Sequence, residues 1–177
     1  MVNKFEAIGI AVSIGAMVLA LYLVRVETTT HSFTVSEPET QSASVYVAGD
    51  GTNPTAVAGA LEDAADDFGN IEKLVIDDVV LGTGTGIVEG DVVTVHYIGS
   101  LQNGQQFDNT YLKGTPFSFE VGKNRVIAGW EQGILGMKVG GQRILVIPSE
   151  LAYGVDDFGP IPGGATLVFA IELLSIE

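Results

Sequence analysis

The sequence contains no cysteine and only two histidines, His31 and His96, among its 177 residues. The missing cysteine excludes disulfides, thiolate nucleophiles and thiolate-bound metals. The two histidines lie far apart in the chain, and neither has a second ligand at helical spacing. The sequence therefore predicts no zinc or iron site and no other cofactor.

Basic residues are also scarce. Eight Lys and Arg stand against 22 Asp and Glu, which gives a formal net charge of −14. This balance excludes nucleic acid as an expected partner, because binding to a phosphate backbone requires a basic surface. The excess of acid is concentrated in residues 26–72, which hold nine acidic residues and no Lys or Arg.

An uncharged apolar run occupies residues 7–24, inside an N-terminal segment of residues 1–25. At ~1.5 Å per residue a helix of this run spans roughly 27 Å, close to the hydrocarbon thickness of a bilayer. We therefore expect a single-pass membrane anchor. A cleaved signal peptide and a buried core helix are the alternatives. The length of the run and the lack of a small-x-small site argue against cleavage.

The orientation of this span rests on few charges. Lys4 precedes it and Arg25 follows it, so the two flanks carry nearly equal numbers of basic residues and give little indication of orientation. No further Lys or Arg occurs before Lys73. We expect the C-terminal part to face outside the cytoplasm.

Residues 26–72 form an acidic segment rich in Ser and Thr, with little that could bury a core. We expect a flexible tether. Within it, residues 55–68 predict a short acidic helix with Ala58, Leu61, Ala65 and Phe68 near one stripe. Two interpretations of residues 55–68 remain: a weakly helical linker, and a lid or docking element for the following domain.

Residues 73–177 change to β-rich runs separated by glycine-rich turns. Residues 128–137 break this pattern, because Trp130, Ile134 and Met137 share one face of a short helix. The pattern predicts an α+β domain with an antiparallel sheet and one helix. The glycine-rich stretch 82–86 lacks the Gly-Lys-Ser/Thr ending of a phosphate loop, so we assign it to a turn.

The order of motifs in this domain is specific. It reads VTVHYIGSL, NGQQFDNT, PFSFEVGK, VIAGWEQGILGMKVGGQR, IPSELAYG and IPGGATLVFAIELL. Over residues 73–177 the chain resembles the FKBP family of macrolide-binding immunophilin isomerases. The resemblance implies an antiparallel sheet of five or six strands wrapped around one short helix. It also implies isomerisation of X–Pro bonds, proline-containing polypeptides as partners, macrolides as inhibitors and a monomeric chain.

The resemblance also implies a pocket. Its expected catalytic residues are Tyr97, Phe107, Asp108, Trp130, Tyr153 and Phe169, and its expected substrate-binding residues are Phe117, Val126, Ile127 and Ile161. Trp130 is the expected floor, and the Ile127 N–H and Tyr153 hydroxyl are the expected donors to substrate carbonyls. Asp108 is expected either to orient polar groups at the rim or to interact with the twisting amide, and not to act as a general acid or base.

Three residues depart from the family pattern. Lys113 stands where many members have an arginine that braces the aspartate, which predicts a weaker brace for Asp108. Phe158 replaces a frequent histidine, and Gly163 replaces a frequent proline.

Two other functions remain possible besides an enzyme: a module that binds proline-containing segments with little turnover, and an assembly factor for one membrane complex.

Overall fold

The computed structural model describes residues 45–47, 63–65 and 70–177. The expected anchor at residues 7–24 and most of the tether lie outside the described residues. Within the part of the chain that is described, no helix combines the length and the apolar character needed to cross a membrane.

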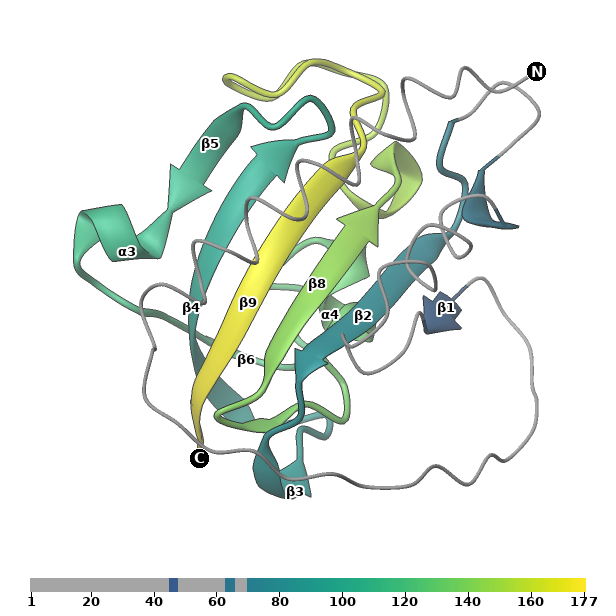
Figure 1. The fold of residues 1–177 in the computed structure, drawn as a ribbon. Coiled ribbons are helices and arrows are strands. Elements are labelled where there is room, and N and C mark those ends of the chain that lie inside the picture. The colour runs from purple at the N-terminus through teal and green to yellow at the C-terminus, as the bar shows by residue number, and fades with distance from the viewer. Residues whose placement is uncertain (1–44, 48–62, 66–69) are drawn as a thin grey trace.

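Among the described residues, seven strands form the main sheet, in the order β1-β2-β8-β9-β4-β5, with β6 also paired to β4. The strands are β1 (Val45–Val47), β2 (Leu74–Val80), β4 (Val92–Leu101), β5 (Gln106–Asn109), β6 (Phe117–Glu120), β8 (Gln142–Ile147) and β9 (Leu167–Ile176). Figure 1 shows β9 between β4 and β8, with β5 at one edge. The antiparallel sheet is confirmed. The strand number exceeds the expected five or six because β1 adds a strand, parallel to β2.

The expected short helix is α4 (Ala128–Gly133), which lies behind the sheet in Figure 1. The prediction of a helix to residue 137 is wrong, because the chain turns at Gly136, which has a left-handed φ of 76°. The predicted face is correct: Trp130, Ile134 and Met137 are all buried in the main core.

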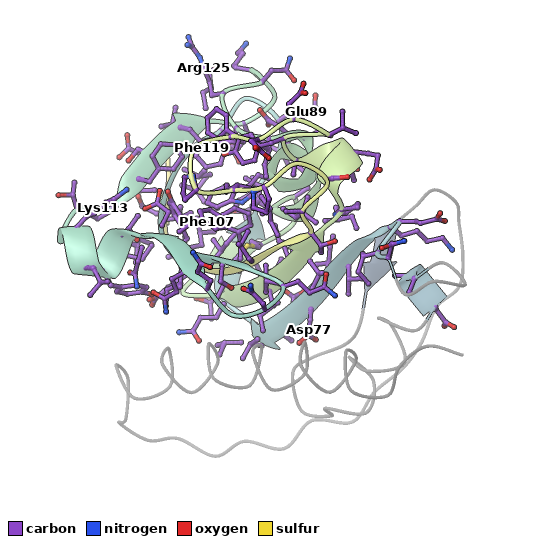
Figure 2. The ribbon with its side chains drawn as sticks, turned by 90° about the horizontal axis from the view of Figure 1, so that it is seen from above. Asp77, Glu89, Phe107, Lys113, Phe119 and Arg125 are labelled. Carbon is purple, nitrogen blue, oxygen red and sulfur yellow. The ribbon has the colours of Figure 1, made fainter. Side chains whose placement is uncertain are left out.

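Strand alternation gives the sheet two buried faces. Along β9, Leu167, Phe169 and Ile171 belong to the cluster on the helix side. Val168 and Ala170 belong to a second cluster on the other side. Because successive side chains of a strand point to opposite faces, each central strand serves both clusters. We call the helix side the inner face and the other side the outer face. In Figure 2, Asp77 lies apart from Phe107 and Phe119, towards the outer side.

Part of the expected tether is built into the domain. Ala64 is 1 % exposed and Ile71 is 5 % exposed, and both pack in the outer-face cluster. The Glu72 N–H donates to the Ala64 carbonyl at 2.9 Å, and β1 pairs with β2. A free tether over 26–72 is therefore wrong at these residues, and the docking alternative for 55–68 is favoured at Ala64 and Ala65.

The assignment of residues 82–86 to a turn is also wrong. Thr83–Gly86 forms β3, which pairs with β7 (Lys138–Val139) in a small separate sheet. A Cβ added at Gly82 would lie 2.2 Å from the Lys138 carbonyl oxygen. The glycine is therefore needed because two backbones approach closely here.

Two further short elements of the described residues, the helix α3 (Thr110–Lys113) and the 3-10 turn η1 (Ser149–Leu151), were not expected. Asn109 caps α3, since its side-chain oxygen accepts from the Tyr111 N–H at 2.9 Å. This cap fixes the chain directly after β5. It thereby holds Phe107 and Asp108, the β5 residues that the next section places in the pocket.

Candidate functional site

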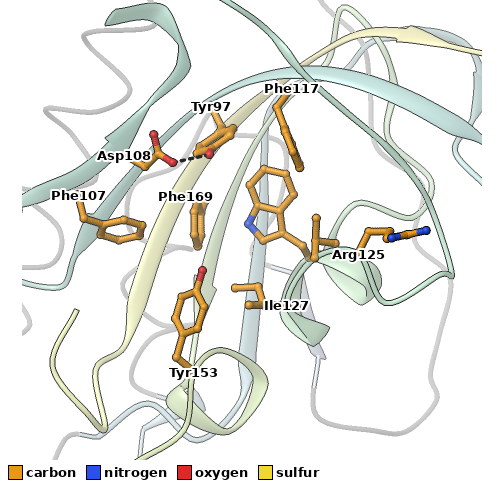
Figure 3. Close-up of a pocket in the computed structure, with 10 residues that line it drawn as sticks. Tyr97, Phe107, Asp108, Phe117, Arg125, Ile127, Tyr153 and Phe169 are labelled. Atoms are coloured by element: carbon orange, nitrogen blue, oxygen red, sulfur yellow. Dashed lines mark hydrogen bonds between the residues drawn. The ribbon is translucent and has the colours of Figure 1, made fainter. Parts of the chain in front are cut away.

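A pocket opens on the inner face of the sheet, above α4. It has a volume of about 170 Å³ and is lined by Tyr97, Phe107, Asp108, Phe117, Arg125, Val126, Ile127, Trp130, Tyr153 and Phe169. A dry cavity of about 150 Å³ accommodates benzene, so this space is sufficient for a five-membered ring. The structure thus brings nine of the ten expected residues together around one open cavity (Figure 3).

The floor and walls of the pocket are aromatic rings set edge to face. Trp130, from α4, is 3 % exposed. Its ring centroid lies 5.0 Å from that of Tyr97, with an interplanar angle of 86°, and 5.2 Å from that of Phe169, at 88°. Phe107 meets Phe169 at 5.7 Å and 85°. This geometry matches the ring quadrupoles and fixes the shape of the apolar surface.

Two glycines make room for these rings. A Cβ at Gly99 would lie 2.9 Å from the rings of both Phe107 and Phe169. At Gly129 a Cβ would lie 2.4 Å from Ile147, which would push α4 away from the sheet. The glycines of the YIG and AGW motifs therefore act through close packing and not through an unusual φ.

Asp108 is the centre of a polar network at one side of the pocket. Its Oδ2 accepts from the Tyr97 hydroxyl at 2.7 Å, and its Oδ1 accepts from the Asn109 N–H at 2.7 Å. The Lys113 ammonium lies 2.5 Å from Oδ1, so lysine occupies the bracing position. Burial acts to raise the pKa of Asp108, but Lys113, Tyr97 and Asn109 together hold that pKa below its ordinary value. Asp108 is accordingly a carboxylate at neutral pH and is not suited to donating a proton.

Both of the expected hydrogen-bond donors remain free at the pocket edge. Neither the Ile127 N–H nor the Tyr153 hydroxyl makes a hydrogen bond within the described part of the chain. Burial and then the charge of Asp108 raise the pKa of Tyr153, so its hydroxyl stays protonated. The pKa of Tyr97 is also raised, mainly by burial and by its bond to Asp108. Tyr97 differs from Tyr153 because its hydroxyl already donates a hydrogen bond to the Asp108 carboxylate.

The loop after Tyr153 packs against the ring of this tyrosine. Phe158 stacks on Tyr153, with ring centroids 4.2 Å apart and an interplanar angle of 6°. At Gly163 a Cβ would lie 2.0 Å from the Val155 carbonyl oxygen. In this loop conformation a proline therefore cannot replace Gly163, and Phe158 orients the Tyr153 ring.

Ile161 and Arg125 differ from the expectation. Ile161 is 4 % exposed and packs in the core with Trp130, so it supports the pocket from behind instead of lining it. Arg125 lines the pocket but was not among the expected residues. The sequence could have indicated Arg125, because it directly precedes the expected pocket residues Val126 and Ile127. The backbone at Ile127 is extended, so this segment runs along the pocket.

The groups that line the pocket can bind a ligand through non-covalent contacts. Among residues 45–47, 63–65 and 70–177, no three His, Asp or Glu side chains form a group that could hold a metal ion. The pocket instead combines an apolar, concave surface with the free Ile127 N–H and Tyr153 hydroxyl donors and one fixed carboxylate. Such a site suits an apolar ring flanked by carbonyl groups.

Comparisons with known proteins agree with this geometry. The family model of FKBP-type peptidyl-prolyl cis-trans isomerases matches residues 84–174. FK506-binding protein 2 of Emericella nidulans is 56% identical over 90 residues, which cover 50% of this chain and 67% of that protein. FK506-binding protein 4 of Gibberella zeae is 48% identical over 107 residues, which cover 60% of this chain. That match spans only 21% of the longer protein.

A solved structure shows the same fold. The crystal structure of FkpA from Escherichia coli superposes with a TM-score of 0.56 at 44% sequence identity. The superposition covers 59% of this chain and 48% of that one. The fold assigned from the motif order, an antiparallel sheet with a short helix, is thereby confirmed.

Proposed function

Because the chain belongs to the FKBP-type peptidyl-prolyl cis-trans isomerase family, we propose that it accelerates rotation about X–Pro bonds in folding polypeptides. The observation that supports this most is the convergence of Tyr97, Phe107, Trp130 and Phe169 on one open cavity. These four rings come from β4, β5, α4 and β9, so only the complete fold assembles them.

The reaction needs no bond to be broken. An amide resists rotation by ~18–20 kcal/mol because its C–N bond is partly double. An enzyme must favour the twisted state, in which this resonance is lost, over the planar one. A water-poor pocket does this by fitting the twisted geometry, and lowering the barrier by ~5–8 kcal/mol accelerates exchange roughly 10⁴–10⁶-fold.

In this proposal the prolyl ring packs on Trp130, and the surrounding rings exclude water. The Ile127 N–H and the Tyr153 hydroxyl donate to the carbonyl oxygens on either side of the rotating bond. Asp108 holds the Tyr97 hydroxyl at 2.7 Å and thereby keeps that ring in the wall. No residue transfers a proton to the amide.

A proline-limited refolding assay tests this function with the full-length chain in a non-ionic detergent. We expect acceleration by the parent chain and a loss of at least tenfold for Trp130→Leu, since burial of a large apolar group is worth ~1.5–3 kcal/mol. Val88→Ala serves as a control, because Val88 is 60 % exposed and does not line the pocket. Binding of a proline-containing peptide without any acceleration by the parent would instead support the binding module.

We further propose that residues 1–25 anchor the domain in a membrane and that the domain faces outside the cytoplasm. The uncharged run of residues 7–24 supports this. Fractionation of cells that express the full chain should place it in the membrane pellet after carbonate extraction. A protease added outside intact spheroplasts should then digest the domain. A soluble, shortened chain would support signal cleavage instead.

Macrolide binding and a monomeric state belong to the same proposal. A macrolide such as FK506 should compete with the peptide for the pocket and abolish the acceleration. Light scattering of the solubilised chain, corrected for detergent, should give the mass of one chain. The assembly-factor alternative predicts that a pull-down partner is lost when residues 26–72 are replaced by a Gly/Ser linker of equal length.

A further inference from the structure

Arg125 is the free cation of the pocket. Lys113 and Lys123 pair with Asp108 and Glu120, at 2.5 and 3.5 Å. Arg143 is buried and bonded to Asp78. Arg125 is exposed, lines the pocket and has no hydrogen bond or ion pair within the described residues. Its five donors are therefore available to a ligand.

Two acidic residues around this loop, Glu120 and Glu131, are already engaged. Glu120 pairs with Lys123, and the Glu131 Oε2 accepts from the Gly122 N–H at 2.6 Å. Glu89 lies beside Gly122, where an added Cβ would be 3.5 Å from the Glu89 Cβ. These contacts shape the loop that carries Arg125 and leave its guanidinium group without a carboxylate partner among the described residues.

The pocket is electrically asymmetric. Figure 3 places Asp108 and Arg125 on opposite sides, with Phe117 and Phe169 between them. Residues 73–177 hold twelve acids and six bases, so the domain as a whole repels anionic peptides. At the mouth of the pocket, the Arg125 guanidinium group attracts a carboxylate.

From this we propose that Arg125 is a specificity-determining residue, which favours substrates with a Glu or Asp side chain next to the proline. The inference rests on the isomerase function proposed above. The planar guanidinium group can bind a carboxylate through two parallel hydrogen bonds. Because the group is exposed, the attraction is modest, and we expect about a two- to fivefold preference in kcat/KM over the neutral isostere.

Capped peptides test this preference with the full-length chain. One set places Glu, Gln or Lys directly before the proline and Leu after it, and a second set reverses these places. NMR exchange spectroscopy gives kcat/KM for each peptide without a coupling protease. In one of the two sets the order should be Glu above Gln above Lys, and the spread should shrink at 1 M salt, where the Debye length is about 3 Å.

Matched variants separate the role of Arg125 from its contribution to total charge. Arg125→Gln should abolish the Glu/Gln preference, and Arg125→Glu should reverse it in favour of Lys. Lys138→Gln removes the same charge from an exposed position outside the pocket and should keep the preference of the parent. A merely structural role for Arg125 would lower all rates together and could not reverse their order.

The outcomes keep the two proposals apart. Equal rates of the parent with Glu, Gln and Lys peptides in both sets would overturn the inference while the isomerase function stands. An unchanged preference in Arg125→Gln would overturn it as well. If the parent accelerates none of the peptides, the proposed function itself fails.

Discussion

The inner and outer faces of the sheet are made by the same strands yet differ in residue type and in access. The inner face carries large aromatic rings around an open pocket. The outer-face cluster is mainly aliphatic: Val75, Ile98, Ile144, Val146, Val168 and Ala170 are buried in it, and the partly buried Val79 and Tyr111 pack against it. Neighbours such as Phe169 and Ala170 belong to different faces.

This difference separates function from stability within one sheet. The pocket rings hold one another edge to face around an open cavity of about 170 Å³. Aliphatic residues with Ala64 and Ile71 on top close into a dry layer. Substitutions of the pocket-lining rings on the inner face should therefore act mainly on catalysis, and those on the outer face mainly on folding.

The largest effect is expected on the outer face. Ile144→Ala should lower the free energy of unfolding by about 2–5 kcal/mol, because Ile144 is 2 % exposed and its loss leaves a cavity. Ile144→Val should cost only about 0.5–1.5 kcal/mol. Urea unfolding measures both. A change in kcat/KM per folded molecule would break the separation of the two faces.

Removal of the covering segment should have the next largest effect. A chain that begins at residue 73 loses Ala64, Ile71 and the pairing of β1, and should be less stable than one that begins at residue 45 by about 2 kcal/mol. Thermal unfolding of the two chains gives the difference. Equal stability would show that residues 45–72 are a tether after all.

On the inner face, Phe169→Leu should lower kcat/KM about 5–10-fold, since an aromatic pair is worth ~0.5–1.5 kcal/mol beyond its buried area. Ala170→Gly, one residue along β9, should leave kcat/KM unchanged and lower stability. Rates of peptide isomerisation and urea midpoints for both variants test this contrast. Equal losses of activity would mean that the faces are coupled through the strand.

The smallest effect concerns the charge of Asp108. Its pKa is lower in the folded chain than the ordinary value of about 3.9, so its carboxylate contributes stability above about pH 4. That contribution is lost as the pH falls through the folded-state pKa. Asp108→Asn should be less stable at pH 7 by about 1 kcal/mol or less, because Lys113 is largely exposed.

Unfolding curves from pH 2 to 7 should converge for the parent and Asp108→Asn at the acidic end. Curves that stay parallel over this range would contradict the ionised state of Asp108. Lys113→Gln is the control, because it removes the ion pair with Asp108 and leaves the Asp108 carboxylate in place.

The sequence predicted the inner face better than the outer one. Trp130, Ile134 and Met137 showed their common face through helical spacing, and the motif order located nine of the ten lining residues. β3 was missed because its Gly-Thr alternation carries no apolar signal. Its pairing depends on a close backbone approach at Gly82.

Other features depend on contacts that a linear pattern does not contain. Ala64 and Ile71 stand in an acidic, polar segment, and only the apolar outer face explains their burial. Ile161 looked equivalent to the other pocket residues, but a short turn, in which the Phe158 N–H donates to the Ile161 carbonyl, places it in the core. Arg125 has a charged side chain of ordinary surface type, and only its place at the pocket mouth distinguishes it.

The most direct test of the account is an NMR titration of the full-length chain in detergent micelles with a capped Leu-Pro peptide. We predict shift changes at Tyr97, Trp130 and Phe169, including the indole N–H, and none at the methyl groups of Val146 and Val168. Changes centred on the outer-face methyl groups, or none at the aromatic residues at saturating peptide, would contradict the assignment of the inner pocket as the prolyl site.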